Sequence, residues 1–171
     1  MPPIRTENDQ KAVWNALSNN QIDTIGTDHV ANQIKLKLDG DDVWGALAGF
    51  PGIGTSLPLL LNYGVNQNRI TVEQLVKFTS QNAARIFGMY PQKGTLVKNS
   101  DADVTMINLK KEKKVTSELF GGFSDYIVYE GQNLKGWPVK TMVRGELVAE
   151  NFEVIGKIGH GKHVSRTVLS K

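Results

Sequence analysis

The sequence predicts an α/β first half followed by an all-β second half, with the boundary near Pro91. In the first half, apolar residues recur mainly at helical spacing, most clearly over residues 70–88. After Pro91 the apolar residues fall instead in short runs typical of strands and hairpins. We therefore divide the chain into residues 1–90 and residues 91–171, the second part ending in a basic tail.

The first half is expected to alternate helices with one short strand and one long loop. Thr6 precedes a run in which apolar residues have helical spacing, which predicts a helix ending near Asn19. Residues 22–25 are expected to form a short buried strand. Residues 30–54 are polar and contain glycine, and a loop of that length inside a domain is usually functional or disordered. An apolar helix over residues 55–63 should end at Gly64.

Residues 70–88 give the clearest helical signal in the chain. Thr71 and Gln74 have the spacing of a capping box, in which each side chain satisfies a backbone N–H of the other residue. Gly88 is expected to end the helical region as the residue after its C-cap. The sequence therefore predicts both ends of this region as well as the helix itself.

The second half is expected to consist of strands joined by turns. Residues 104–109 are predicted to form a strand, and the lysine-rich residues 110–114 a charged, solvated turn. Gly121-Gly122 indicates a flexible bend. Residues 140–148 read as a hairpin that turns at Arg144-Gly145.

Composition excludes several classes of protein. The 171 residues are 40% hydrophobic and 22% charged, which is typical of a globular chain. The absence of cysteine excludes a disulfide framework and thiol chemistry, and fits a cytoplasmic protein. No apolar run approaches bilayer length, so we expect no membrane association. The net charge of +3 is mild, and the lysine cluster of residues 110–114 has no interleaved aromatic residues, so we expect no nucleic-acid partner. A small nucleic-acid binder is a third alternative, which rests only on this cluster and the positive charge.

Asp28 is the most informative residue, because residues 22–29 place a carboxylate and an imidazole at the end of the expected strand. Catalytic groups in α/β proteins commonly lie at strand ends, where the sheet fixes them and the loops admit ligand. The alternative is that Asp28 only caps a turn. His160 and His163 have a spacing that suits metal ligands on a helix, but the surrounding glycines favour a plain basic tail.

Taken in order, several segments resemble the C-terminal portion of the cyclic amidohydrolases, the family of hydantoinase, dihydropyrimidinase, allantoinase and dihydroorotase. The resemblance covers the chain from end to end. The segments that carry it are Pro2-Pro3-Ile4-Arg5, residues 22–29, 49–61 and 82–94, Ser100-Asp101-Ala102-Asp103, residues 131–138, Val143-Arg144-Gly145 and Gly159-His160-Gly161. No single motif is unique to the family, but so many of them in this order are hard to obtain by chance.

The resemblance implies a (β/α)8 barrel accompanied by a small β-sandwich, of which this chain would hold the last βα portion and part of the sandwich. Asp28 matches the aspartate that the family uses as a metal ligand and as the base that moves a proton to the leaving nitrogen. Ala48 and Gly49 match the substrate loop, where dihydropyrimidinase-like members have an asparagine in place of Ala48. The substrate is expected to be a small cyclic amide or ureide.

The departures from the family concern the metal. The complete enzyme is expected to hold a divalent metal pair, zinc by resemblance, through a His-x-His pair, a carboxylated lysine and two further histidines that this chain lacks. We therefore expect the chain alone to hold no metal and to be inactive. Its expected partners are further copies of itself or a complementing N-terminal segment. The alternative is a non-catalytic interaction module derived from the same family.

Overall fold

The computed structural model describes residues 5–40 and 42–166. Two of its helical segments, η1 and η2, are π-helical, and η3 is a 3-10 helix. In chain order the elements are α1 (Glu7–Ser18), α2 (Ile34–Lys37), α3 (Ile53–Leu59), η1 (Leu60–Val65), α4 (Val72–Val76), η2 (Lys77–Gln81), α5 (Asn82–Ile86), β1 (Val104–Lys114), η3 (Ser117–Phe120), β2 (Asn133–Val143), β3 (Glu146–Glu150) and β4 (Glu153–Val154).

Helix α1 confirms the first predicted helix and begins at a local cap. The Thr6 hydroxyl accepts the backbone N–H of Asp9, while the Asp9 carboxylate accepts the backbone N–H of Thr6. These two bonds satisfy donors that have no partner inside the helix. The helix ends at Asn19, the C-cap, as the sequence indicates.

The two other predicted helical regions are also confirmed. Helix α3 continues directly into η1, so that this helical region covers the predicted residues 55–63 and extends beyond them at both ends. At the start of α4, Thr71 and Gln74 make the predicted capping box. Gly88 follows the C-cap of α5 with a φ of +69°, a conformation that glycine adopts without a steric penalty.

The four strands form one antiparallel sheet in the order β1-β2-β3-β4. The predicted hairpin is confirmed as β2 and β3, which meet at Arg144 and Gly145. Both turn residues have positive φ values, +49° and +82°, as the tightest hairpin turns require.

The predicted charged turn over residues 110–114 is wrong, because β1 continues through Lys114. An irregularity in the pairing between Asn108 and Glu112 lets the strand continue, and the Asn108 side chain accepts the backbone N–H groups of Lys110 and Lys111 there. The Lys113 ammonium lies 4.4 Å from the centre of the Phe152 ring. Long lysine side chains can cover apolar surface in this way while their charged ends stay in water.

The predicted strand over residues 22–25 is not formed. A strand needs a neighbouring strand to pair with, and no described segment lies alongside these residues in a sheet. They are held instead by the backbone N–H of Ile25, which donates to the Phe78 carbonyl, and by the Asn82 amide, which donates to the Asp23 carbonyl. The described residues therefore contain one antiparallel sheet and helices, and the barrel portion implied by the resemblance is not confirmed by them.

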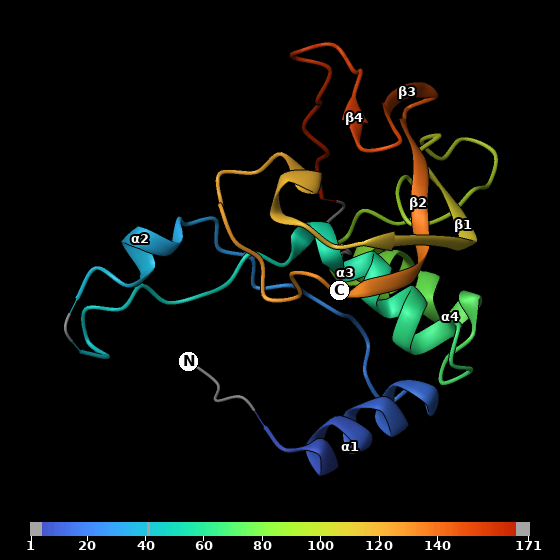
Figure 1. The fold of residues 1–171 in the computed structure, drawn as a ribbon. Helices are drawn as coiled ribbons and strands as arrows, with labels where there is room; N and C mark the ends of the chain where they lie inside the picture. Colours follow the sequence, from blue (N-terminus) through green and yellow to red (C-terminus); the bar gives the residue numbers. More distant parts are fainter. Residues whose placement is uncertain (1–4, 41, 167–171) are drawn as a thin grey trace.

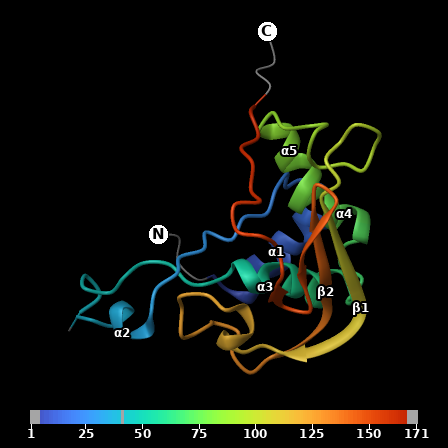
Figure 2. The same cartoon turned by 90° about the horizontal axis from the view of Figure 1, so that it is seen from above.

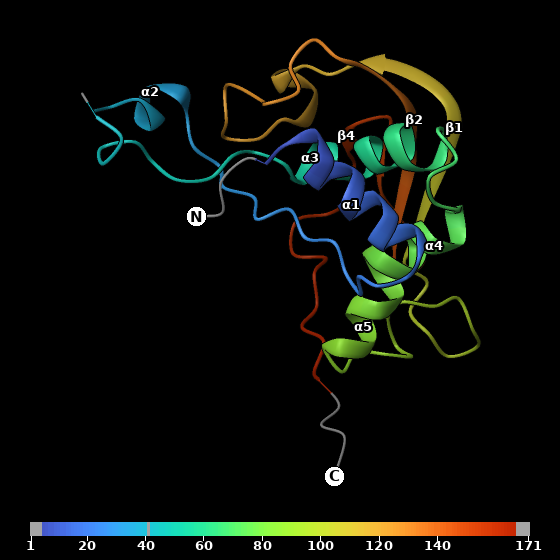
Figure 3. The same ribbon diagram turned by 90° about the horizontal axis from the view of Figure 1, so that it is seen from below.

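The helices of the first half pack against the sheet of the second half (Figure 1). One core cluster lies among the helices and contains Leu17, Leu61, Ile70, Leu75 and Phe78. A second cluster lies between η1 and the sheet and contains Val115, Ile127, Leu134 and Trp137, with Leu59 and Tyr63 packed against it. Helix α1 forms the outermost layer, on the side of α3 away from the sheet (Figure 3).

Gly136 shows how closely the helical layer and the sheet approach each other. A Cβ atom at this position of β2 would lie 2.7 Å from the Cβ of Leu61 in η1, and the φ of Gly136 is +98°. Both the space and the backbone conformation therefore require glycine. Trp137, the next residue, is fully buried and stacks on Phe120.

Residues 30–40 and 42–50, which we call the arm, extend away from this packed body (Figures 1 and 2). The arm contains α2 and several exposed apolar side chains, among them Leu38, Val43 and Trp44, the last of which is 89% exposed. Its two sides are joined by the Lys37 ammonium, which donates to the carbonyls of Leu47 and Gly49. No helix in the described residues is long and apolar enough to cross a membrane.

Candidate functional site

Asp28 lies where the unpaired segment meets the arm. Its φ is +45°, a conformation that Asp adopts more readily than most residues, and its side chain is exposed. Within residues 5–40 and 42–166, no hydrogen bond involves its carboxylate, so nothing in these contacts supports the alternative that Asp28 caps a turn. The carboxylate is therefore open to a ligand or to another chain.

His29 closes the base of the arm. Its Nδ1 accepts the backbone N–H of Gly52 at 3.0 Å and that of Ile53 at 3.3 Å. The backbone N–H of Val30 donates to the Phe50 carbonyl, and His29 and Phe50 form a parallel bridge. An imidazole nitrogen that accepts hydrogen bonds carries no proton, so the proton of the neutral ring is on Nε2. The Asp28 carboxylate is thus accessible to a ligand, whereas the His29 ring is bonded to the start of α3.

The two substrate-loop residues expected from the sequence lie on the returning side of the arm. Gly49 has a φ of +88°, and a Cβ atom there would lie 2.3 Å from a methyl carbon of Val30. The structure therefore brings Gly49 against the residue two positions after Asp28. Ala48 is exposed beside it. The fold thus places the candidate carboxylate and the candidate substrate loop at the same end of the arm.

A contact from the second half of the chain holds residues 32–34 of the arm, and no sequence motif indicates it. The Tyr126 hydroxyl donates to the Asn32 side-chain oxygen at 2.6 Å, and Asp125 accepts the backbone N–H of Ile34 at 2.8 Å. Burial raises the pKa of Tyr126, and the nearby Asp125 charge raises it further, so the hydroxyl keeps its proton near neutral pH. Tyr126, Asp125 and Asn32 are functional candidates that motif analysis missed, because their pairing spans more than 90 residues.

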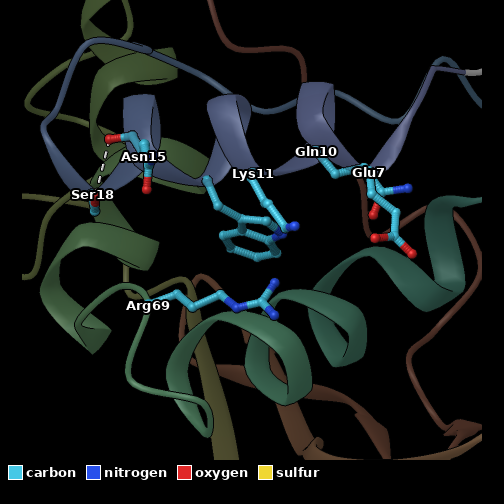
Figure 4. Close-up of a pocket in the computed structure, with 7 residues that line it drawn as sticks. Glu7, Gln10, Lys11, Asn15, Ser18 and Arg69 are labelled. Carbon is cyan, nitrogen blue, oxygen red and sulfur yellow. Dashed lines mark hydrogen bonds between the residues drawn. The ribbon is translucent and has the colours of Figure 1, made fainter.

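Cavities of two kinds bear on the choice of a site. A largely apolar one of about 170 Å³ lies next to His29, between the base of the arm and residues 117–127, and its walls include Pro51, Phe120 and Tyr126. The other, of about 420 Å³, lies between α1 and Arg69 (Figure 4). In that cavity the Arg69 guanidinium lies 5.2 Å from the centre of the Trp14 ring. No residue of the arm lines the larger cavity, so only the smaller one borders the Asp28 segment.

A charged cluster ties the loop before β1 to the β2–β3 turn. Burial disfavours the charged form of Lys93, but hydrogen bonds to Asp101 and Asp103 outweigh this and raise the Lys93 pKa. The hydrogen bond from Lys93 lowers the pKa of Asp101. Burial would raise the pKa of Asp103, but hydrogen bonds from Lys93 and from the backbone of Arg144 bring it below its usual range. Because every member is paired within the cluster, its role is structural.

His160 is part of the same region and is not a free basic-tail residue as the sequence suggested. Its Nε2 lies 3.1 Å from the Val143 carbonyl, its Nδ1 lies 3.4 Å from the Glu146 carboxylate, and its own carbonyl accepts the Arg144 guanidinium. Glycines on both sides let the chain reach the hairpin turn without forming a helix.

The described residues do not fit a metal centre by themselves. They contain no group of three or more His, Cys, Asp or Glu side chains placed to hold a metal ion. Asp28 supplies one carboxylate, whereas a single zinc ion usually takes three or four protein ligands. A divalent metal would therefore need ligands from outside this set of residues.

Comparisons with known proteins show the family to which the chain belongs. The sequence pattern of the amidohydrolase family matches residues 5–148. L-hydantoinase from Paenarthrobacter aurescens is 42% identical over 166 residues, which is 96% of this chain and 36% of that protein. D-hydantoinase from Geobacillus stearothermophilus is 34% identical over 167 residues, with the same shares of the two chains.

Solved structures show the same relationship. The L-hydantoinase (dihydropyrimidinase) from Arthrobacter aurescens superposes with a TM-score of 0.91 at 42% identity, covering 96% of this chain and 37% of that one. Dihydropyrimidinase from Brevibacillus agri superposes with a TM-score of 0.94 at 31% identity, covering 99% and 37%. This chain belongs to the amidohydrolase family. It spans about 36% of the length of the curated relatives that it matches.

Proposed function

We propose that this chain supplies the proton-transferring carboxylate and part of the substrate loop of an enzyme that hydrolyses a C–N bond in a cyclic amide or ureide. The observation that carries the proposal is the position of Asp28: it is exposed and unpaired in the described structure, at the base of the arm where Gly49 returns. The relatives are named hydantoinases and dihydropyrimidinases, which supports the substrate class.

The chemistry assigned to Asp28 is a proton transfer. Ring opening adds water to the amide carbonyl carbon and breaks its bond to nitrogen, so the water must lose a proton and the leaving nitrogen must gain one. A carboxylate within reach of both can carry that proton from the oxygen to the nitrogen, and it ends the cycle unchanged. Asp28 is exposed at the base of the arm, so its carboxylate is accessible from solvent.

The proposal requires a second segment that supplies the metal ligands and the remaining strands of the barrel. Because the described residues offer no metal centre, we expect the 171-residue chain alone to open no ring and to retain less than one zinc per chain after dialysis. One or more tightly held zinc ions per chain, lost in Asp28→Ala, would contradict this expectation. Metal analysis of the dialysed chain, beside the Asp28→Ala variant, distinguishes the two outcomes.

The proposed role of Asp28 is tested with Asp28→Asn, which keeps the size of the side chain and removes its basicity. The chain is combined with a segment that supplies the missing strands, and ring opening is followed for hydantoin, dihydrouracil, allantoin and dihydroorotate. Positioned acid–base groups contribute about 10² to 10⁴ in rate, so kcat should fall by that order with little change in KM. Near-full turnover on the best of these rings would show that Asp28 has no part in the chemistry.

The second candidate function is a non-catalytic interaction module, and one observation is compatible with it. Several large apolar side chains of the arm are exposed, with Val43 and Trp44 the most exposed among them. Such a surface would serve binding in either function, so it does not separate them. Turnover by the combined chains separates the two functions, because an interaction module would restore no ring opening.

A further inference from the structure

We propose that Tyr126 is a positioning residue that holds the segment following Asp28, so that the second half of the chain fixes the base of the arm. The proposal rests on the proposed function of Asp28. It concerns four residues, Asn32 and Ile34 of the arm and Asp125 and Tyr126 of the second half, which we call the clasp.

The clasp joins segments that are remote in the sequence. Asn32 and Tyr126 are 94 residues apart, and Ile34 and Asp125 are 91 residues apart. In Figures 1 and 2 the segment that contains Asp125 and Tyr126, drawn in gold, lies beside the blue segment that leads into α2. The clasp therefore fixes residues 32–34 relative to the body of the molecule.

The other bonds at the base of the arm lie within residues 29–53. His29 is bonded to Gly52 and Ile53, the backbone of Val30 to Phe50, and Lys37 to Gly49. These bonds keep the two sides of the arm together and tie His29 to the start of α3, but none of them contacts residues 32–34. Tyr126 and Asp125 are different because they belong to another part of the fold. They can hold the backbone four residues after Asp28 at a fixed position.

Burial makes the Tyr126 hydroxyl important to Asn32. The Asn32 side chain is only 5% exposed, and its Nδ2 has no hydrogen-bond partner within the described residues. The bond from Tyr126 is thus the one that compensates the amide for its loss of water. Without this hydroxyl both ends of a buried amide would lack a partner, which is costly enough to drive the side chain and its backbone toward solvent.

Amide hydrogen exchange on the intact chain tests the clasp without any catalysis. Tyr126→Phe should raise the exchange rates of the backbone amides of Val30 and Ile34 by about five- to tenfold, the loss expected for one buried hydrogen bond. Tyr129→Phe, which removes a hydroxyl from the same segment but not from the clasp, is the matched control and should leave these rates unchanged. Equal rates in wild type and Tyr126→Phe would overturn the proposal.

A second pair of variants tests the same arrangement if Tyr126→Phe does not fold. Asp125→Asn keeps an oxygen that can accept the Ile34 N–H, whereas Asp125→Ala removes it. Faster exchange at Ile34 in Asp125→Ala but not in Asp125→Asn supports the clasp. The same rate at Ile34 in both variants as in the wild type contradicts it.

Turnover of the combined chains then connects the clasp to Asp28. Tyr126→Phe should lower kcat about tenfold or more with little change in KM, because a carboxylate that is displaced still allows the ring to bind. Asp28→Asn should lower kcat without changing exchange at Ile34. Altered exchange with unchanged kcat would overturn the positioning role, whereas retained turnover in Asp28→Asn would overturn the proposed function instead.

Discussion

Asp28 and His29 are adjacent in the chain but differ in what their side chains contact. The His29 ring is anchored by two backbone N–H groups at the start of α3, whereas the Asp28 carboxylate is exposed. A carboxylate that transfers a proton must be held at a fixed position relative to its substrate. The anchored His29 ring fixes the backbone next to Asp28 and leaves the Asp28 carboxylate exposed. The same division recurs on the other side of the arm, where Gly49 packs against Val30 and Ala48 is exposed.

The contrast between Ala48 and Gly49 leads to a prediction about substrate choice. Because Ala48 is exposed, Ala48→Asn should be accommodated and should shift the combined chains toward six-membered dihydropyrimidines through one added hydrogen bond. Gly49→Ala is the contrasting variant, since its Cβ would collide with Val30 at a positive φ and loosen the arm. The measurement is the ratio of kcat/KM for dihydrouracil to that for hydantoin. An unchanged ratio in Ala48→Asn would remove Ala48 from the substrate loop.

At the scale of the elements, structure that depends on local sequence could be predicted and structure that depends on remote pairing could not. The capping box at Thr71 and the turn at Arg144-Gly145 are set by neighbouring residues, and both were predicted. The strand expected over residues 22–25 failed because no partner strand lies beside it in the described part of the chain. The turn expected over residues 110–114 failed because β2 pairs with residues 112–114, so β1 continues through them. Of the candidate site, Asp28 was predicted from the sequence, whereas Tyr126 depends on a remote contact that no motif encodes.

The charged cluster beneath the β2–β3 turn predicts how stability depends on pH. Hydrogen bonding lowers the pKa values of Asp101 and Asp103 in the folded chain, so their contribution is present above the unfolded carboxyl pKa and is lost as the pH falls through the folded values. Unfolding by urea should therefore require less denaturant as the pH drops below about 4, the usual pKa of an aspartate. The double variant Asp101→Asn/Asp103→Asn should show a weaker acid dependence, and an unaltered dependence would contradict the assignment.

Replacing Trp137, which lies in the core beside the sheet, is expected to cause a large loss of stability. Trp137 is fully buried against Phe120 and Phe152, so Trp137→Ala should lower the free energy of unfolding by about 3–5 kcal/mol, as large-to-small core substitutions do. Trp44→Ala is the matched control, because Trp44 is 89% exposed, and it should change stability by less than about 0.5 kcal/mol. Urea unfolding curves of both variants give the comparison. Similar losses in the two variants would mean that Trp137 is not a core residue.

At the scale of the whole molecule, the two halves of the sequence form one packed body from which the arm extends. The helices and the sheet share a buried interface through Leu59, Tyr63 and Trp137, so the body does not depend on the arm for its core. The arm instead presents apolar side chains, which monomeric proteins rarely leave in large exposed patches. Either a segment that completes the barrel or a second copy of this chain would cover the arm.

In the absence of a complementing segment, we expect the chain to self-associate through the arm. Large exposed apolar surfaces drive association. Val43 and Trp44 are the most exposed of the large apolar side chains of the arm. Sedimentation at increasing protein concentration should show oligomers or aggregates of the wild type and a shift toward monomer in Val43→Ser/Trp44→Ser. Ile158→Ser, which removes an exposed apolar side chain outside the arm, should leave the distribution unchanged. A monodisperse wild-type monomer that binds no hydrophobic dye would show that the arm is not a binding surface, because an uncovered apolar surface should either self-associate or bind the dye.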